Sequence, residues 1–417
     1  MEAHELARKA HQASVVLRSA TTTQKNRFLS ILQDELRNGE QELLAANEQD
    51  LSVADEGGIS EALRDRLLLN ASRIQGIISA VSVIEELPDP VGEQSETVQR
   101  PSGIVVSRMS VPLGVVLMVY ESRPNVTIEA GALALKSGNA VILKGGKEAR
   151  HSIAALGDVL RRSLRQAGLP EDSVQYIGTS ERKFLYELLK QKSYIDLVIP
   201  RGGTSLIEAV SQHSTIPVLQ HYQGICHVYV HESADVDNAK NIILNSKTQR
   251  PGVCNALECI VIDRAFALKH LSILVEALCE ARVEIRACSV TRDIIGKRDG
   301  VFGASDEDFD TEFLSMICAI KIVEDLEEAL HFISEHGSHH TEAIVAEDES
   351  AIDRFLREVD ASCVVANAST RFNDGGELGL GAELGISTTK LHAYGPMGLR
   401  ELCTKKFVVR GNGQIRT

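Results

Sequence analysis

Residues 2–86 carry apolar side chains at helical spacing, with Phe28, Leu32 and Leu36 on one stripe. Serine, threonine and aspartate residues separate such segments. An apolar stripe that returns at every third or fourth position is typical of an amphipathic helix. We therefore expect this region to consist of helices that pack outside a sheet.

The pattern changes after the two prolines of residues 87–91, and a boundary near Pro88 is expected. Residues 97–109 are rich in β-branched side chains and read as strands. Short apolar runs then alternate with helical segments. We predict strands at 115–120, 140–143, 174–177 and 195–199, and helices at 126–136, 149–166 and 182–190.

This alternation is typical of parallel βαβ units, which bind ligands at the carboxyl ends of their strands. It resumes after Asp235 with a helix, a strand at 259–262, a helix that runs to Glu280 and further units through Val365. The second set predicts a second α/β domain. From Asn367 onward glycines become dense, which fits loops that bring the backbone close to a ligand or to another domain.

Composition narrows the class of protein. The chain has 417 residues, 43% of them hydrophobic, which is enough for a sizeable core and two or three domains. A formal net charge of −14 argues against nucleic-acid or anionic-membrane partners. Residues 1–12 lack the apolar segment of a secretory signal, and no run approaches the roughly 20 apolar residues of a membrane span. We expect a cytoplasmic enzyme with reduced thiols.

One cysteine has a polar, turn-forming context. Cys254 follows a Pro-Gly pair, and Lys247 and Arg250 are close in sequence. Nearby cations favour the thiolate, so Cys254 is the candidate nucleophile. The commoner role of a cysteine, a small buried hydrophobe, is expected for the others, which have largely apolar surroundings. These are Cys226, Cys259, Cys279, Cys288, Cys318, Cys363 and Cys403.

Two further motifs follow predicted strands. Asn125 opens a predicted helix, where its amide and the helix N-terminal N–H groups suit an oxyanion, although a helix cap is the commoner use of such a residue. Lys144-Gly-Gly-Lys147 lies at the carboxyl end of a strand, where a nucleotide binds in an open sheet, although a solvated lysine pair is an even alternative. The chain has neither G-x-G-x-x-G nor the P-loop pattern.

Histidines His331, His336, His339 and His340 lie close in sequence. No cysteine or carboxylate constellation completes a metal site with them, so we predict no metal. We expect the imidazoles to line the mouth of the catalytic domain.

Several stretches of the chain together resemble the gamma-glutamyl phosphate reductases of the aldehyde dehydrogenase superfamily, in the same order and over nearly the whole length. They are Tyr120-Glu-Ser-Arg-Pro-Asn-Val-Thr, Leu143-Lys-Gly-Gly-Lys-Glu, Ile199-Pro-Arg-Gly-Gly, Lys247-Thr-Gln-Arg-Pro, Asn367-Ala-Ser-Thr-Arg-Phe and Leu391-His-Ala-Tyr-Gly-Pro-Met-Gly-Leu. The resemblance implies an α/β, aldehyde-dehydrogenase-like fold with a Rossmann-type cofactor domain, an α/β catalytic domain and a small β oligomerisation arm.

The domain boundaries expected from this resemblance are as follows. Residues 1–96 and 111–229 form the NADPH-binding domain, and residues 230–390 the catalytic domain. Residues 97–110 and 391–417 form the arm. Because a two-stranded ribbon is marginal alone, another subunit is expected to cover it, which implies a homo-oligomer.

The implied reaction is the NADPH-dependent reduction of L-glutamyl 5-phosphate to L-glutamate 5-semialdehyde and phosphate, the second step of proline biosynthesis from glutamate. By resemblance Cys254 forms a thioester and Asn125 is the oxyanion donor. Functional coupling to glutamate 5-kinase is a further implication.

By the same resemblance Lys144 and Lys147 contact the cofactor's adenosine ribose, and Glu312 is the nicotinamide-ribose carboxylate. Gly202 and Gly203 are assigned to the cofactor site as well. NAD-preferring relatives tend to carry a carboxylate where this chain has Lys147, and a cation there pairs with a 2′-phosphate and favours NADP(H).

The substrate needs recognition of its own. Arg371, with Ser369 as a helper, is the candidate for the glutamyl carboxylate because a guanidinium binds a planar carboxylate with two hydrogen bonds. Lys247 and Arg250 are candidates for the phosphate.

One segment departs from the family. Gln220-His221-Tyr222 replaces a stretch that is glycine-rich in some relatives, and Gln220 stands where hydrolytic aldehyde dehydrogenases carry a glutamate base. Two rival hypotheses remain: a CoA-acylating or simple aldehyde dehydrogenase with another substrate, and a catalytically idle scaffold on the same fold. Retention of Cys254, Asn125 and both lysines speaks against the second.

Overall fold

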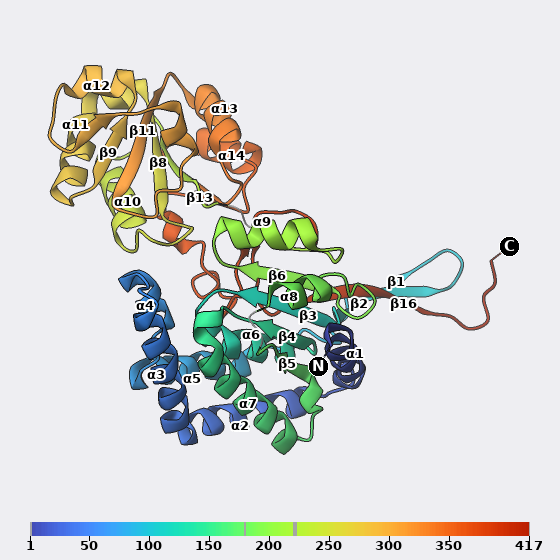
Figure 1. The fold of residues 1–417 in the computed structure, drawn as a ribbon. Coiled ribbons are helices and arrows are strands. Elements are labelled where there is room, and N and C mark those ends of the chain that lie inside the picture. The colour runs from blue at the N-terminus through green and yellow to red at the C-terminus, as the bar shows by residue number, and fades with distance from the viewer. Residues whose placement is uncertain (1, 179–180, 220–222, 417) are drawn as a thin grey trace. The chain divides into compact units, whose positions relative to one another are not determined.

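The computed structural model describes residues 2–178, 181–219 and 223–416 (Figure 1). The chain forms two compact units, which are described separately. Unit 1 comprises Met1–Gln220, Gly379–Gly385 and Met397–Thr417, and unit 2 comprises His221–Leu378 and Ile386–Pro396.

The N-terminal part of unit 1 is helical, as its apolar stripes predict. The helices are α1 (Ala3–Leu17), α2 (Thr22–Asn38), α3 (Glu40–Glu56), α4 (Glu61–Leu67) and α5 (Ala71–Glu86). Thr21 and Gln24 begin α2 with a reciprocal capping box, which satisfies backbone N–H groups that the first turn leaves open. The stripe that includes Phe28 and Leu32 is buried, and α2 packs on α5 and α7.

The sheet of unit 1 is parallel and has the strand order β5-β4-β3-β6. Its strands are β3 (Val115–Tyr120), β4 (Ala140–Lys144), β5 (Val174–Tyr176) and β6 (Leu197–Arg201). The helices that connect or follow them are α6 (Asn125–Lys136), α7 (Arg150–Ala167), α8 (Arg182–Leu188) and α9 (Thr204–His213). Every residue of β3 is buried, as expected for a strand covered on both faces. The predicted βαβ alternation is confirmed.

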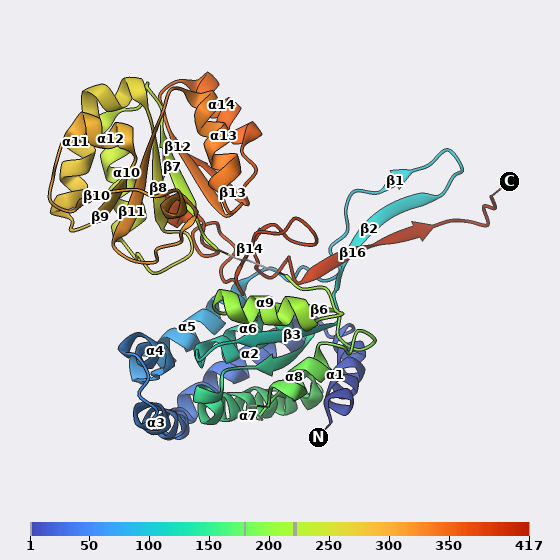
Figure 2. The same ribbon diagram turned by 45° about the horizontal axis from the view of Figure 1, so that its top comes forward.

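An antiparallel ribbon also belongs to unit 1. It consists of β1 (Val98–Gln99), β2 (Val105–Pro112) and β16 (Cys403–Arg410). Strands β2 and β16 pair from Pro112 with Cys403 to Val105 with Arg410. Figure 2 shows β2 and β16 running side by side away from the parallel sheet. The ribbon thus joins two segments that lie nearly three hundred positions apart in the sequence.

Unit 2 holds a parallel sheet of seven strands in the order β10-β9-β11-β8-β7-β12-β13. The strands are β7 (Cys226–Val230), β8 (Leu257–Asp263), β9 (Glu284–Ala287), β10 (Val301–Gly303), β11 (Ile317–Val323), β12 (Thr341–Val345) and β13 (Cys363–Ala366). The helices are α10 (Val236–Thr248), α11 (Arg264–Glu280), α12 (Ser289–Ile295), α13 (Leu326–His336) and α14 (Glu349–Glu358).

Two apolar cores form on this sheet. One core includes side chains of α10 and α11, such as Ile243 and Phe266, with residues of α12 packed against it. The other includes Phe332 of α13 and Phe355 of α14. Helices therefore cover both faces, which explains why β8 is buried along its whole length.

Short elements complete the chain. They are the 3₁₀ turns η1 (Lys147–Ala149), η2 (Glu171–Ser173), η3 (Asp306–Asp310) and η4 (Thr370–Phe372), and the paired strands β14 (Ile386–Ser387) and β15 (Gly395–Pro396). Within the described residues, no helix is long and apolar enough to cross a membrane.

The units differ from the expected domains in several segments. Residues 379–385, expected in the catalytic domain, cluster with unit 1, and so does the ribbon. Strand β7 pairs with β8 and β12, so residues 221–229 cluster with unit 2 rather than with the cofactor domain. Residues 391–396 also cluster with unit 2, because β15 pairs with β14 there. In the C-terminal segment the ribbon strand itself begins only at Cys403.

Candidate active site

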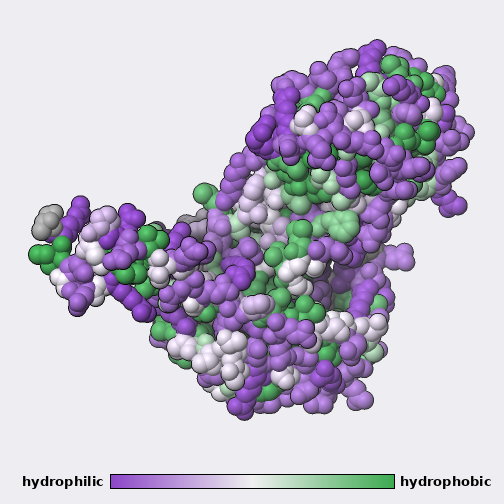
Figure 3. All heavy atoms as spheres, turned by 180° about the vertical axis from the view of Figure 1, so that it is seen from behind, coloured by the Kyte–Doolittle hydropathy of each residue, from purple (hydrophilic) through white to green (hydrophobic). Residues whose placement is uncertain are grey.

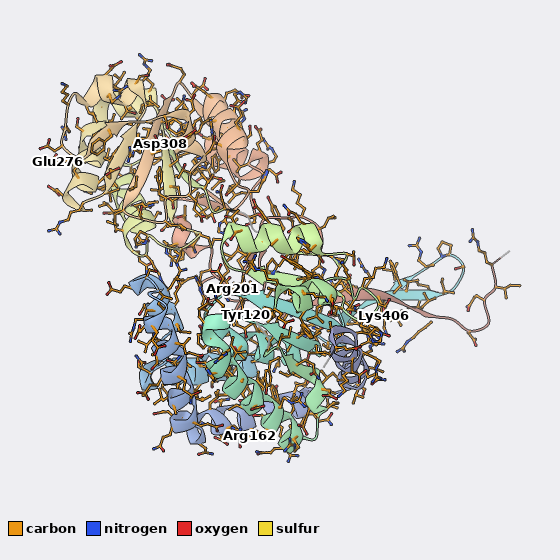
Figure 4. All side chains as sticks on the ribbon, viewed as in Figure 1. Tyr120, Arg162, Arg201, Glu276, Asp308 and Lys406 are labelled. Carbon is orange, nitrogen blue, oxygen red and sulfur yellow. The ribbon has the colours of Figure 1, made fainter. Side chains whose placement is uncertain are left out.

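The parallel strands of unit 1 end at a common edge. Tyr120 ends β3 and is in register with Arg201, which ends β6 (both labelled in Figure 4). Lys144 ends the neighbouring strand β4. A cavity of about 430 Å³ lies at this edge. It is lined by Val119, Tyr120, Glu121, Ser122, Lys144, Gly145, Gly146, Lys147, Glu148, Arg182, Leu185, Tyr186, Ser205, Leu206, Ala209 and Val210.

A second cavity, of about 400 Å³, shares the turn from Lys144 to Glu148 and is otherwise lined in part by α3 and Ile177. The ammonium of Lys144 donates to the carbonyl of Gly145 at 2.8 Å. Burial lowers the pKa of Lys144, and the Glu148 carboxylate opposes that shift. Lys147, at the start of η1, is exposed. The turn therefore presents a partly buried ammonium at Lys144 and an exposed one at Lys147 to both cavities.

The predicted glycines Gly202 and Gly203 lie where β6 leads into α9. A Cβ at Gly202 would overlap the side chain of Glu121, so this close approach requires glycine. Glu121 Oε1 accepts a hydrogen bond from Gly203 N at 2.8 Å. On this side the cavity is lined by α9 side chains such as Leu206. The glycines thus shape the start of α9, and the cavity wall comes from the helix itself.

Asn125 is the first residue of α6, and its side chain does not cap the helix. Its Nδ2 donates to Glu129 Oε1 at 2.9 Å. Glu129 in turn lies 3.9 Å from the guanidinium of Arg201. Because an amide NH₂ group has two hydrogens, this contact orients the amide and leaves one hydrogen for an acceptor.

In unit 2, Cys254 lies in the turn between α10 and β8 and is partly exposed. Its backbone is held from two sides. A Cβ at Gly224 would overlap the carbonyl oxygen of Cys254, so the two backbones are in close contact. Cys226 Sγ donates to the same carbonyl at 3.2 Å.

Four other cysteines, Cys226, Cys259, Cys318 and Cys403, are buried. Burial raises the pKa of each of these thiols, to about 12 for Cys318 and about 11 for Cys403. Such thiols stay protonated and unreactive at neutral pH, which matches the role expected for them.

Lys247 does not lie where the sequence analysis expected it. Its side chain is fully buried, and its ammonium donates to Glu258 Oε2 at 2.7 Å and to the carbonyl of Leu257 at 2.6 Å. The reason is helical periodicity: Ala239, Ile243 and Lys247 follow one another every four residues on the buried face of α10. An ammonium engaged in this way is not offered to a phosphate, whereas Arg250 is exposed.

Glu312 is half-buried, and its Oε1 accepts from Gly224 N at 3.0 Å. Burial raises the pKa of Glu312. Gly224 is the residue that packs on the carbonyl of Cys254. The structure therefore brings two of the predicted site residues together through a glycine that the sequence analysis did not single out.

Arg371 lies in η4 beside the turn that carries Cys254, residues 249–256 between α10 and β8, which is called the nucleophile turn below. Its Nε donates to Gln249 Oε1 at 2.8 Å, and its Nη1 donates to Asn255 Oδ1. Burial lowers the pKa of Arg371, and the charges that act on it include Arg250 and Cys254. Arg371 therefore contacts Gln249, which precedes Arg250 in sequence, and Asn255, which follows Cys254. Asn255, which was not among the predicted site residues, links Arg371 to the turn that carries Cys254.

Ser369 anchors the same turn. Its Oγ lies 2.9 Å from Ser246 Oγ of α10 and accepts from Arg371 N at 3.2 Å. Thr370 Oγ1 donates to the carbonyl of Asn255 at 2.7 Å. Ser369 is buried, so its hydroxyl positions η4 rather than facing solvent.

The histidines of residues 331–340 have separate partners. His336 Nδ1 lies 2.7 Å from Asp310 Oδ1, and His339 Nδ1 lies 2.7 Å from the carbonyl of Asp360. His331 and His336 line a small cavity of about 190 Å³ in unit 2. Among the described residues, no group of three or more histidine, cysteine or acidic side chains could hold a metal ion. The departure at Gln220-His221-Tyr222 lies outside the described residues.

Comparison with known proteins gives consistent matches. The model of the aldehyde dehydrogenase family matches residues 1–288. Gamma-glutamyl phosphate reductase of Desulfotalea psychrophila is 51% identical over 413 residues, which cover 99% of this chain and 98% of the relative. That of an Anaeromyxobacter species (strain Fw109-5) is 49% identical, with 100% and 97% covered. The crystal structure of gamma-glutamyl phosphate reductase from Thermotoga maritima superposes with a TM-score of 0.97 at 43% identity and covers both chains completely.

Proposed function

We propose that this chain, which belongs to the gamma-glutamyl phosphate reductases of the aldehyde dehydrogenase family, reduces L-glutamyl 5-phosphate with NADPH to L-glutamate 5-semialdehyde and phosphate. This reaction is the second step of proline biosynthesis from glutamate. The observation that carries the proposal is the contact in unit 2 between Arg371 and Asn255, the residue that follows Cys254. The test is NADP⁺ reduction with glutamate 5-semialdehyde, with and without phosphate.

In the proposed mechanism the Cys254 thiolate attacks the acyl carbon of the substrate. The carbon–oxygen bond to the phosphate breaks, phosphate leaves with the electron pair, and a thioester remains. When bound, NADPH supplies the hydride that converts the thioester to the aldehyde and releases the thiolate. Asn125 donates the free hydrogen of its amide to the oxyanion that develops at the acyl oxygen.

Substrate recognition is assigned to the cations near Cys254. Arg371 binds the glutamyl carboxylate, and the partly exposed guanidinium is already oriented by Gln249 and Asn255. Arg250, which is exposed, binds the phosphate. Ser369 supports Arg371 through the backbone of η4. Lys247 has a structural role in this proposal rather than a contact to phosphate.

The edge of the unit 1 sheet fits the cofactor. Two cavities flank the Lys144–Glu148 turn, and cations from Lys144, Lys147 and Arg182 line the first. Open α/β sheets bind dinucleotides at this edge. We assign the ribose contacts to the two lysines, and the nicotinamide-ribose contact to Glu312.

Reversing the charge at Lys147 is expected to change cofactor preference. Lys147→Glu should weaken NADPH much more than NADH, because a carboxylate repels the 2′-phosphate and accepts from a 2′-hydroxyl. A charge-assisted contact is worth about 1.5 to 3 kcal/mol, so the KM for NADPH should rise roughly ten- to more than a hundred-fold. The measurement is KM for each cofactor.

Lys192→Glu is the matched control for charge, since Lys192 is exposed in the same unit and lines neither cavity. This variant should keep the KM values for NADPH and NADH near those of the parent. If the KM values for NADPH and NADH rose equally in Lys147→Glu, Lys147 would not be the residue that contacts the 2′-phosphate.

The ribbon suits an interface between copies of this chain. Its exposed apolar residues include Phe407, which is 70% exposed, and Val409, which is 58% exposed. Figure 3 shows apolar side chains among polar ones on its surface. The ribbon joins two long strands and one strand of two residues, so it has little stability of its own and gains stability when another subunit covers it. We propose a homo-oligomer formed through the ribbon.

Phe407→Ser is expected to lower the molar mass in solution, because it removes an exposed aromatic from this interface. Lys406→Ser, at the adjacent position and on the opposite face of β16, is the control and should keep the mass of the parent. Size-exclusion chromatography with light scattering measures both. An unchanged mass in Phe407→Ser would place the interface elsewhere.

A further inference from the structure

A buried ion pair lies beneath the nucleophile turn of unit 2. The side chains of Lys247 and Glu258 are 0% and 1% exposed, and their charged atoms lie 2.7 Å apart. Lys247 lies in the last turn of α10 and Glu258 lies in β8, on either side of the turn that carries Cys254. Removing two charges from water is expensive and adds little net stability, so such a pair points to a need other than stability.

The second oxygen of Glu258 contacts a strained backbone. Glu258 Oε1 accepts from Leu314 N at 3.2 Å. Leu314 has a φ of 52°, in the left-handed region that costs a bulky residue roughly 1 to 2 kcal/mol. Its side chain is 43% exposed, so burial of the side chain does little to hold this conformation. The contact from Glu258 is the hydrogen bond that the structure shows on the Leu314 amide.

The same segment reaches the nucleophile by a second route. Glu312, two residues earlier, accepts from Gly224 N at 3.0 Å, and Gly224 packs on the Cys254 carbonyl. On the other side of the turn, a Cβ at Gly252 would lie 3.7 Å from the carbonyl oxygen of Leu314. Segment 312–314 therefore reaches Cys254 in two ways. Glu312 contacts Gly224, which packs on the Cys254 carbonyl, and Leu314 lies close to Gly252, two residues before Cys254.

We propose that Glu258, paired with Lys247, is a positioning residue that keeps segment 312–314 in register with the nucleophile turn. Through segment 312–314 the buried pair fixes both the Glu312 carboxylate and the backbone of Cys254. The catalytic consequence rests on the proposed function, in which Glu312 contacts the cofactor and Cys254 carries the thioester. The positioning role itself rests only on contacts within unit 2.

The first test removes the pair without leaving an unpaired charge. Lys247→Met/Glu258→Leu replaces it with apolar groups, which often leaves stability unchanged, but it also removes the acceptor of Leu314 N. We expect a melting temperature near that of the parent and a kcat lower by about a hundred-fold, as for a small misplacement of reacting groups. The matched control is His227→Met/Glu342→Leu, which removes another buried pair in the same sheet. The control should keep the parent kcat.

A readout independent of activity is hydrogen exchange. In the test variant the peptides that contain residues 312–316 and 252–256 should both exchange about ten-fold faster or more, while the rest of unit 2 exchanges as in the parent. In the control variant neither peptide should change. If the assay for glutamate 5-semialdehyde fails in the parent, the proposed function fails, and the exchange result still decides the positioning role.

A double-mutant cycle with Glu312→Gln completes the test. If Glu258 acts through Glu312, the loss in kcat for Glu258→Gln and Glu312→Gln together should not exceed the larger single loss. Glu258→Gln also serves if the apolar pair does not fold. Additive losses, or a test variant with parent kcat and parent exchange at residues 252–256, would overturn the proposal.

Discussion

Cys254→Ser is expected to fold normally and to lose turnover by several orders of magnitude. An acyl-enzyme route needs an atom that is both nucleophile and leaving group, and a serine hydroxyl, which is a much weaker acid than a thiol, is poor at both. Cys254 is partly exposed, so the exchange of sulfur for oxygen should cost little stability. The measurements are kcat with glutamate 5-semialdehyde and NADP⁺, and the melting temperature.

Cys279→Ser is the matched control, because Cys279 is also partly exposed and lies in α11, outside the nucleophile turn. It should keep the activity of the parent. The assignment of the nucleophile would be wrong if Cys259→Ser abolished turnover while Cys254→Ser stayed close to the parent.

Oxidation of the aldehyde is expected to require phosphate. By its resemblance to aldehyde dehydrogenases, the chain is expected to carry Gln220 in place of the glutamate base of the hydrolytic enzymes, and an amide cannot deprotonate water. A thioester on Cys254 should persist until a nucleophile that needs no deprotonation arrives, and phosphate is already anionic at neutral pH. Without phosphate or arsenate we expect at most one NADPH per active site, and steady turnover once either is added. Stopped-flow absorbance followed by steady-state rates measures both.

The variant Arg250→Ala sharpens this prediction. Because Arg250 is proposed to bind phosphate, its removal should raise the phosphate concentration needed for half-maximal turnover and leave the first NADPH per site intact. Sustained turnover without phosphate that yields free glutamate would mean a hydrolytic dehydrogenase. Turnover that depends on CoA instead would mean an acylating one.

Much of the fold could be predicted from the spacing of apolar residues. The strand predicted at 140–143 is observed at Ala140–Lys144, and the helix predicted to end at Glu280 does so. Strand β7 was missed because His227 interrupts its apolar run. That imidazole is buried and lies 2.8 Å from the carboxylate of Glu342, which comes from a strand more than a hundred positions later. A partner at that separation cannot be seen in the local pattern.

The candidate site was predictable in part. The polar turn singles out Cys254, but nearness in sequence alone presents Lys247 as a neighbouring surface cation. Its spacing from Ile243 gives the buried face, so periodicity could have corrected the prediction. Glu258, a carboxylate within a continuous apolar strand, was also a signal that a buried cation was needed. Gly224 gave no signal, since a close approach of two backbones depends on tertiary structure.

The central claim is an acyl-enzyme on Cys254, and mass spectrometry of its peptides tests it most directly. The protein is mixed with glutamate 5-semialdehyde and NADP⁺ without phosphate, quenched in acid and digested. We predict one glutamyl adduct per chain, on the peptide that contains Cys254, which disappears when phosphate is added before the quench. An unmodified Cys254 peptide during NADPH formation, or an adduct on another cysteine, would contradict the account.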